Sequence, residues 1–109
     1  MKEKLLRIIN HYEVNNQLKK LNEEVFELIE AIRDYEEDYI RVDCDENMVL
    51  SVFEENIEEE FADVMVLLSQ IKHYYNLDSK RLKKIMDYKI NRQLERIKRG
   101  EWFNGKKHW

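Results

Sequence analysis

The sequence runs Glu23-Glu24-Val25-Phe26-Glu27-Leu28 in its first third and Glu59-Glu60-Phe61-Ala62-Asp63-Val64 in its middle. Both stretches read acid, acid, apolar, apolar, acid, apolar. Residues three apart on an α-helix lie on one face, and apolar residues beside them mark the side that packs. The two stretches therefore predict two amphipathic helices, each with a pair of carboxylates next to its packed face.

Helical periodicity continues on both sides of these stretches. Apolar residues alternate at steps of three and four, which predicts helices over about Val14 to Asp38 and about Glu46 to Tyr75. The two apolar stripes are Val14, Leu18, Leu21, Val25, Leu28, Ile32, Tyr35 and Tyr39, and Val49, Phe53, Ile57, Phe61, Val64, Leu68, Ile71 and Tyr75. The polar segment from Arg41 to Asn47 predicts the turn between the two helices.

Two further helices are expected outside this pair. The first covers about Glu3 to His11, and the last covers Ser79 to Arg99. Asp78 is a good N-cap for the last helix, and Gly100 is a good residue to end it. The sequence has no proline, and its other glycine is Gly105. No strong helix breaker therefore occurs before residue 100.

Chain length limits the architecture. At 109 residues there is room for one domain, so we predict a single all-α domain over residues 1–109, a four-helix bundle with a C-terminal tail at 100–109. A chain this short buries only part of its surface when it folds alone. Association through helix faces would add burial, and we therefore expect an oligomer.

Charge and composition indicate which binding partners the protein lacks and in which cellular compartment it occurs. The formal net charge is −4, with 23 acidic and 19 basic residues, whereas binding to nucleic acid calls for a basic surplus. The longest apolar run, Val64 to Leu68, is far shorter than the ~20 residues of a membrane span. Cys44 is the single cysteine of the sequence, which fits a reducing compartment. We predict a cytoplasmic protein without nucleic-acid or membrane partners.

The carboxylates of the repeated pattern predict a metal site. Glu24 and Glu27 project together from one helix, and Glu60 and Asp63 from the other. Four carboxylates brought close together repel one another and need a cation between them. Oxygen ligands without His or Cys favour Mg²⁺, with Mn²⁺ as a substitute. Glu24 and Glu60 also border the apolar stripes, where an unpaired charge is costly.

Two other metal sites fit the sequence less well. Di-iron carboxylate bundles need a glutamate three residues before a histidine, and no histidine of this sequence follows a glutamate at that spacing. The segment that starts at Asp43 opens like an EF-hand loop, but Met48 stands where the sharp turn of that loop requires glycine. A magnesium site is therefore the favoured interpretation.

The pattern Glu23-Glu24-x-x-Glu27 followed by Glu60-x-x-Asp63 resembles the motif of the MazG-like, all-alpha nucleoside triphosphate pyrophosphohydrolases. The resemblance covers about residues 14 to 100. It implies a helical bundle that forms a homodimer or homotetramer. It also implies Mg²⁺-dependent cleavage of a nucleoside triphosphate between its α and β phosphates, which gives a nucleoside monophosphate and pyrophosphate. On this match Glu24, Glu27, Glu60 and Asp63 are the metal ligands, and Glu23 or Glu24 orients or deprotonates the attacking water.

A second match concerns the substrate. The segment Asn91-Arg92-Gln93-Leu94-Glu95-Arg96 resembles the family's segment with an asparagine and basic residues. Lys89, Arg92 and Arg96 form one basic stripe that could neutralise the β and γ phosphates. Gln17 lies one heptad before Glu24 and is expected to contact the base. The expected substrate-binding residues are thus Gln17, Lys89, Asn91, Arg92 and Arg96.

The sequence departs from the family pattern between its two carboxylate pairs, where the connection is longer than is common. The extra length falls around Tyr39 to Asn47, so the substrate is not inferred from one subfamily. Two alternatives stay open. One is the same fold acting on phosphoribosyl-ATP, dUTP or dCTP. The other is a non-catalytic helical interaction protein whose acidic pairs are purely structural.

Overall fold

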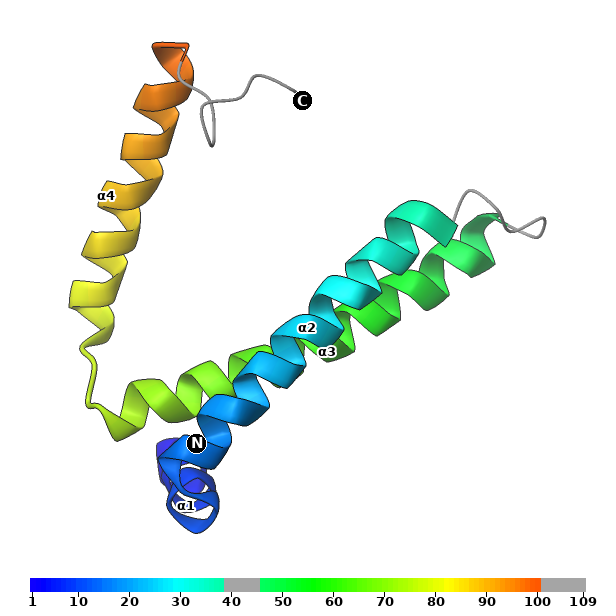
Figure 1. Cartoon of the computed structure of the whole chain (residues 1–109). Coiled ribbons are helices and arrows are strands. Elements are labelled where there is room, and N and C mark those ends of the chain that lie inside the picture. The colour runs from blue at the N-terminus through cyan, green and yellow to red at the C-terminus, as the bar shows by residue number, and fades with distance from the viewer. Residues whose placement is uncertain (39–45, 101–109) are drawn as a thin grey trace. The chain divides into compact units, whose positions relative to one another are not determined.

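The structure, a computed structural model, describes residues 1–38 and 46–100. These residues form four helices and no strand: α1 (Lys2–Tyr12), α2 (Val14–Asp38), α3 (Glu46–Tyr74) and α4 (Ser79–Lys98) (Figure 1). The predicted all-α class is confirmed, and so are the four helices. Residues 41–45 of the predicted turn, with Cys44, and the tail after Gly100 lie outside the described residues, whereas Glu46 and Asn47, also predicted in the turn, belong to α3.

The chain divides into two units. Helices α1, α2 and α3 belong to the first unit, Met1–Asn76, and α4 belongs to the second, which starts at Leu77. A single domain in which all four helices form one bundle stays a prediction.

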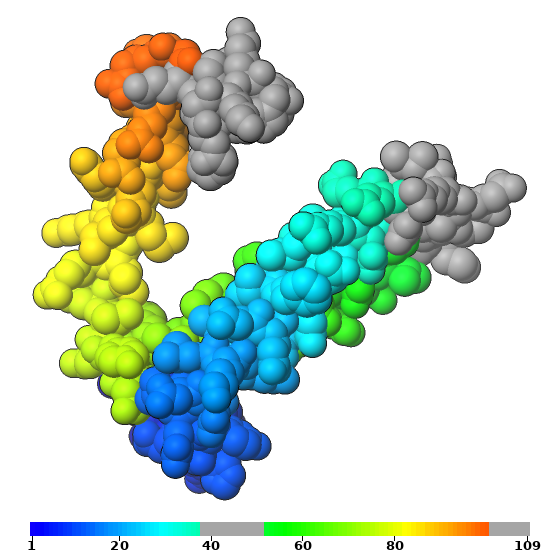
Figure 2. Space-filling view, viewed as in Figure 1, coloured from blue at the N-terminus to red at the C-terminus, as the bar shows by residue number. Residues whose placement is uncertain are grey.

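The first unit is built on the pair formed by α2 and α3. The two helices run antiparallel and lie side by side (Figure 1). Their side chains are in contact along most of the length of the helix pair (Figure 2). Helix α1 packs against both of them. Five apolar side chains form the buried core of the described residues: Leu5, Ile9, Ala31, Val64 and Leu67.

The buried face of α2 is rotated from the predicted stripe. Its covered positions recur at Val14, Gln17, Leu21, Glu24, Leu28, Ala31 and Tyr35. The predicted stripe was wrong at Leu18, Val25 and Ile32, which are exposed. The reason is geometric, because one partner helix covers only a narrow seam of steps three and four. Apolar residues beside that seam remain in solvent within this unit.

Helix α3 is rotated in the same way. Its covered positions recur at Phe53, Ile57, Glu60, Val64, Leu67 and Ile71. The predicted Phe61 and Leu68 are exposed, as is Tyr75. The side chain of Val49 and the whole of Tyr39 lie outside the described part of the chain. The rotation places Glu24 and Glu60 in the seam between the two helices.

The second unit contains α4. Asp78 caps its first turn as predicted, since the backbone N–H of Lys80 donates to the Asp78 carboxylate over 2.9 Å. Gly100 follows the helix with a φ of 82°, a left-handed conformation that favours glycine. The apolar residues of α4 are largely exposed, among them Met86, Ile90, Leu94 and Ile97. None of the helices in the described ranges has the length and apolar character of a membrane span.

Candidate metal centre

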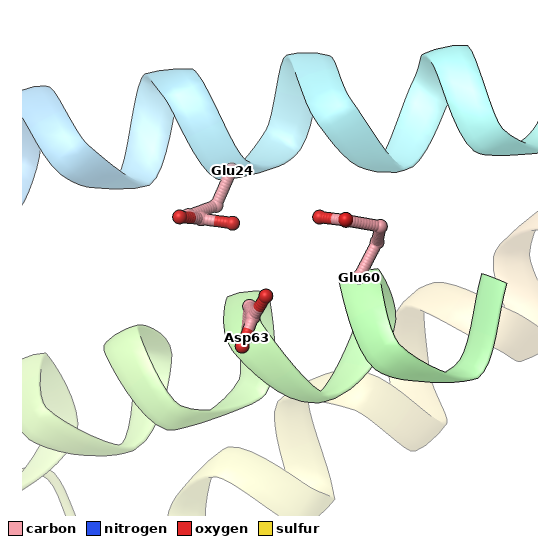
Figure 3. Close-up of side chains that lie close together, drawn as sticks. All are labelled: Glu24, Glu60 and Asp63. Atoms are coloured by element: carbon pink, nitrogen blue, oxygen red, sulfur yellow. The ribbon is translucent and has the colours of Figure 1, made fainter. Parts of the chain in front are cut away.

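Three carboxylates from two helices meet in the seam between α2 and α3. Glu24 points from α2 toward Glu60 and Asp63 of α3 (Figure 3), and one oxygen of each lies within 4.8 Å of the others. Glu60 and Asp63 share a face because they are one turn apart. Oxygens that share one Mg²⁺ stand at most ~4.2 Å apart, twice the Mg–O distance. Side-chain rotations that bring these oxygens closer together would let all three carboxylates contact one ion.

Burial makes this cluster different from a group of surface acids. Glu24 is 6% exposed and Glu60 is half-buried, while Asp63 is exposed. The Oε2 atoms of Glu24 and Glu60 are buried, and neither has a hydrogen-bond partner among the described residues. A buried polar atom without a partner destabilises a fold, and a buried charge does so more strongly. A divalent cation would satisfy both oxygens, so the residues present fit a metal site.

Glu27, the fourth predicted ligand, lies beside this trio. Its side chain is exposed. The pKa of Glu27 is raised above its ordinary value, first by the hydrogen bond to Glu24 and the negative charge of Glu24, then by loss of solvation and by Glu60. This shift means that the ionised form of Glu27 is disfavoured by its neighbours. A cation among these carboxylates would reverse that preference.

The raised pKa of Glu27 predicts a pH-dependent effect on stability. When metal is removed with EDTA, Glu27→Gln should raise the free energy of unfolding at neutral pH, because ionised Glu27 is repelled by Glu24 and Glu60. This gain should shrink as the pH falls through the raised pKa, since the native Glu27 then becomes protonated. Urea unfolding of both proteins across this pH range measures the difference.

The matched control for this experiment is Glu36→Gln, which removes an exposed carboxylate from the same helix. Its effect on the free energy of unfolding should not follow this pH dependence. A gain for Glu27→Gln that is independent of pH, or that grows as the pH falls, would contradict the crowding of these carboxylates.

Lys20 also belongs to the centre, although it was not predicted from the sequence. Its Nζ lies 3.0 Å from Glu24 Oε1 and 4.0 Å from Glu23 Oε2. The hydrogen bond to Glu24 and the charge of Glu24 raise the pKa of Lys20, with smaller contributions from Glu23 and Glu27. The i, i+4 spacing of Lys20 and Glu24 was the available signal. The importance of this spacing could be recognised only once Glu24 was known to be buried.

A pocket of about 670 Å³ adjoins the carboxylates on the same unit. Glu24 and Asp63 line it together with Lys20 and the exposed Glu23. Its other lining residues are Tyr12, Asn16, Gln17, Lys19, Val66, Leu67 and Gln70. The structure thus places an open cavity directly beside the candidate metal ligands.

An amide pair lies in this pocket. The Nε2 of Gln17 donates a hydrogen bond of 2.8 Å to Oε1 of Gln70, and both side chains are buried. Gln17 was expected at the site from its position one heptad before Glu24. Gln70 was missed, although it stands one heptad after Asp63 and continues the same face of α3. The pair fixes the orientation of two amide groups beside the candidate metal ligands.

The remaining predicted site residues lie on α4, in the second unit. Lys89, Asn91, Arg92 and Arg96 are all exposed. The guanidinium carbon of Arg92 lies 5.8 Å from the centre of the Tyr88 ring, a cation–π contact. That these four predicted substrate-binding residues lie near the carboxylates stays a prediction.

A comparison of the chain with protein-family models, curated proteins and solved structures finds no match. The resemblance to the MazG-like family therefore rests on the acidic motif and the Asn91–Arg96 segment of the sequence.

Proposed function

We propose that this protein is a Mg²⁺-dependent nucleoside triphosphate pyrophosphohydrolase of the MazG-like kind. The observation that carries the proposal is the convergence of Glu24, Glu60 and Asp63 across the α2–α3 seam, with two buried carboxylate oxygens that have no hydrogen-bond partner in the part of the chain that the structure describes. A stable two-helix seam would more simply be apolar, since buried charges cost stability. A seam that retains buried carboxylates is typical of a site under functional constraint.

Each residue of the centre has a role in this proposal. Glu24, Glu60 and Asp63 hold the cation, and Glu27 completes the set. A Mg²⁺ ion held by these residues would supply positive charge to stabilise the departing pyrophosphate. Glu23, or a free oxygen of Glu24, orients or deprotonates the water that attacks the α phosphorus. The adjoining pocket, with Gln17 in its wall, receives the nucleoside.

The basic stripe of α4 completes the proposal on the phosphate side. Lys89, Arg92 and Arg96 would neutralise the β and γ phosphates, and Asn91 would add a polar contact. In a homodimer or homotetramer these residues come either from the same chain or from a second copy. Association is supported by exposed apolar residues beside the seam, which the first unit by itself leaves in solvent: Leu18, Val25, Ile32, Phe61 and Leu68.

Two other functions remain as alternatives. The same centre could act on a different pyrophosphate substrate, such as phosphoribosyl-ATP, dUTP or dCTP. A non-catalytic interaction protein with the same fold would need no metal. The buried oxygens of Glu24 and Glu60, which have no partner within residues 1–38 and 46–100, favour the enzyme over the interaction protein.

A panel of nucleoside triphosphates, both ribose and deoxyribose, tests the proposal. With Mg²⁺ we expect at least one of them to yield pyrophosphate and a nucleoside monophosphate in equal amounts. Pyrophosphate and orthophosphate are scored separately, with EDTA as the control for metal. Orthophosphate as the sole product would contradict cleavage between the α and β phosphates, and no turnover with any substrate would favour the interaction protein.

A further inference from the structure

Lys20 stands at the border between the carboxylates and the pocket. Its Nζ contacts Glu24 Oε1 over 3.0 Å, and its side chain is half exposed on the pocket wall. An ordinary helical ion pair of this spacing joins two exposed side chains and contributes little. Here the acidic partner is buried, with 8% of its side chain exposed. Lys20 thus forms an ion pair with Glu24, the most buried carboxylate of the trio and the one whose charge most requires a cation.

A divalent ion and the ammonium of Lys20 require the same carboxylate. Both are positive, and an ion held by Glu24, Glu60 and Asp63 would lie within a few ångströms of the present position of Nζ. Like charges at such a distance repel, most strongly where solvent is partly excluded. Lys20 has a long flexible stem and an open pocket beside it, so its ammonium can turn away from Glu24.

We propose that Lys20 competes with the divalent cation for Glu24 and, once displaced, binds a phosphate of the substrate in the adjoining pocket. This role rests on the proposed function, because it assumes a metal at the carboxylates and a polyphosphate beside it. A phosphate that contacts the metal must lie at the end of the pocket that Glu24 and Asp63 line. Lys20 lies beside these residues, since its Nζ contacts Glu24 over 3.0 Å, and an ammonium is a good point-charge ligand for phosphate. Lys20 would thus exchange the carboxylate of Glu24 for a phosphate of the substrate.

Two binding measurements on Lys20→Met test the proposal without turnover. Methionine keeps an unbranched, flexible side chain but removes the charge. The first measurement is Mn²⁺ binding by calorimetry, for which we expect the variant to bind about three- to tenfold more tightly than the unaltered protein. The second is binding of inorganic tripolyphosphate at saturating Mn²⁺, which we expect to weaken about tenfold.

Three further variants make the result specific. Lys19→Met removes the same charge from the neighbouring residue, which also lines the pocket, and should change Mn²⁺ affinity by less than about twofold. Lys20→Arg keeps the charge and should retain most of the tripolyphosphate affinity. Lys20→Gln is a second uncharged variant in case Lys20→Met does not fold, which circular dichroism will show.

The possible outcomes separate this proposal from the proposed function. Unchanged or weaker Mn²⁺ binding by Lys20→Met would overturn the competition. Tighter Mn²⁺ binding with unchanged tripolyphosphate affinity would overturn the phosphate role. If the unaltered protein bound no Mn²⁺, the proposed function itself would fail, and the role of Lys20 with it.

Discussion

Glu60→Gln is expected to lower Mg²⁺-dependent pyrophosphate release by at least about a hundredfold. Glu60 is one of the three carboxylates that could hold a metal ion, and its Oε2 atom is buried without a hydrogen-bond partner among the described residues. Glutamine keeps the size of the side chain but removes its negative charge. The initial rate of pyrophosphate formation measures the effect, with the best substrate from the nucleotide panel.

The control for Glu60→Gln is Glu59→Gln, which removes the neighbouring, exposed carboxylate and should leave the rate within about threefold. Circular dichroism and urea unfolding exclude a folding defect. In EDTA the free energy of unfolding of Glu60→Gln should be unchanged or higher, because repulsion from the other carboxylates is reduced. Full activity in Glu60→Gln would refute the assignment of the metal ligands.

Ile9→Ala is expected to lower the free energy of unfolding by about 3 kcal/mol. Ile9 of α1 is completely buried in a unit whose described apolar core contains only five residues, so the deleted atoms leave a cavity that little else can fill. A small domain has a total stability of about 5 to 15 kcal/mol. The loss is therefore a large part of what holds α1 against the α2–α3 pair, and urea unfolding measures it.

The neighbouring residue provides the control for this substitution. Ile8 is 36% exposed, and Ile8→Ala should cost less than about 1.5 kcal/mol. Equal effects of Ile8→Ala and Ile9→Ala would show that α1 does not pack in the described orientation. Both variants are compared in EDTA, so that stabilisation by bound metal does not enter the difference.

The polar residues of the seam explain why this unit has so small a core. Gln17 and Glu24 of α2 and Glu60 and Gln70 of α3 are covered at positions that a helix pair built for stability alone would fill with apolar side chains. Their cost is reduced by one amide–amide hydrogen bond and by Lys20. This arrangement is expected where a site is selected for chemistry, because functional polar groups often reduce stability.

Much of this structure could be predicted from local sequence. Each of the four helices begins and ends within one residue of its predicted bounds. Helix boundaries depend on neighbouring residues, such as the Asp78 cap and the left-handed Gly100, so a single sequence contains enough information. The spacing of Glu24 with Glu27 and of Glu60 with Asp63 was likewise a local property, since i and i+3 share a face on any helix.

Tertiary structure alone decided which side of each helix is covered. The apolar stripe of α2 is wide enough for either flank to face the partner, so its periodicity could not choose between Leu18 and Gln17, or between Val25 and Glu24. The pairing of α2 with α3 made the choice, and it buried Glu24. The same pairing brought Asp63 and Glu60 to Glu24, and set Gln70 opposite Gln17. Such contacts join residues far apart in the chain, and their energies depend on the register between two helices, which no local pattern fixes.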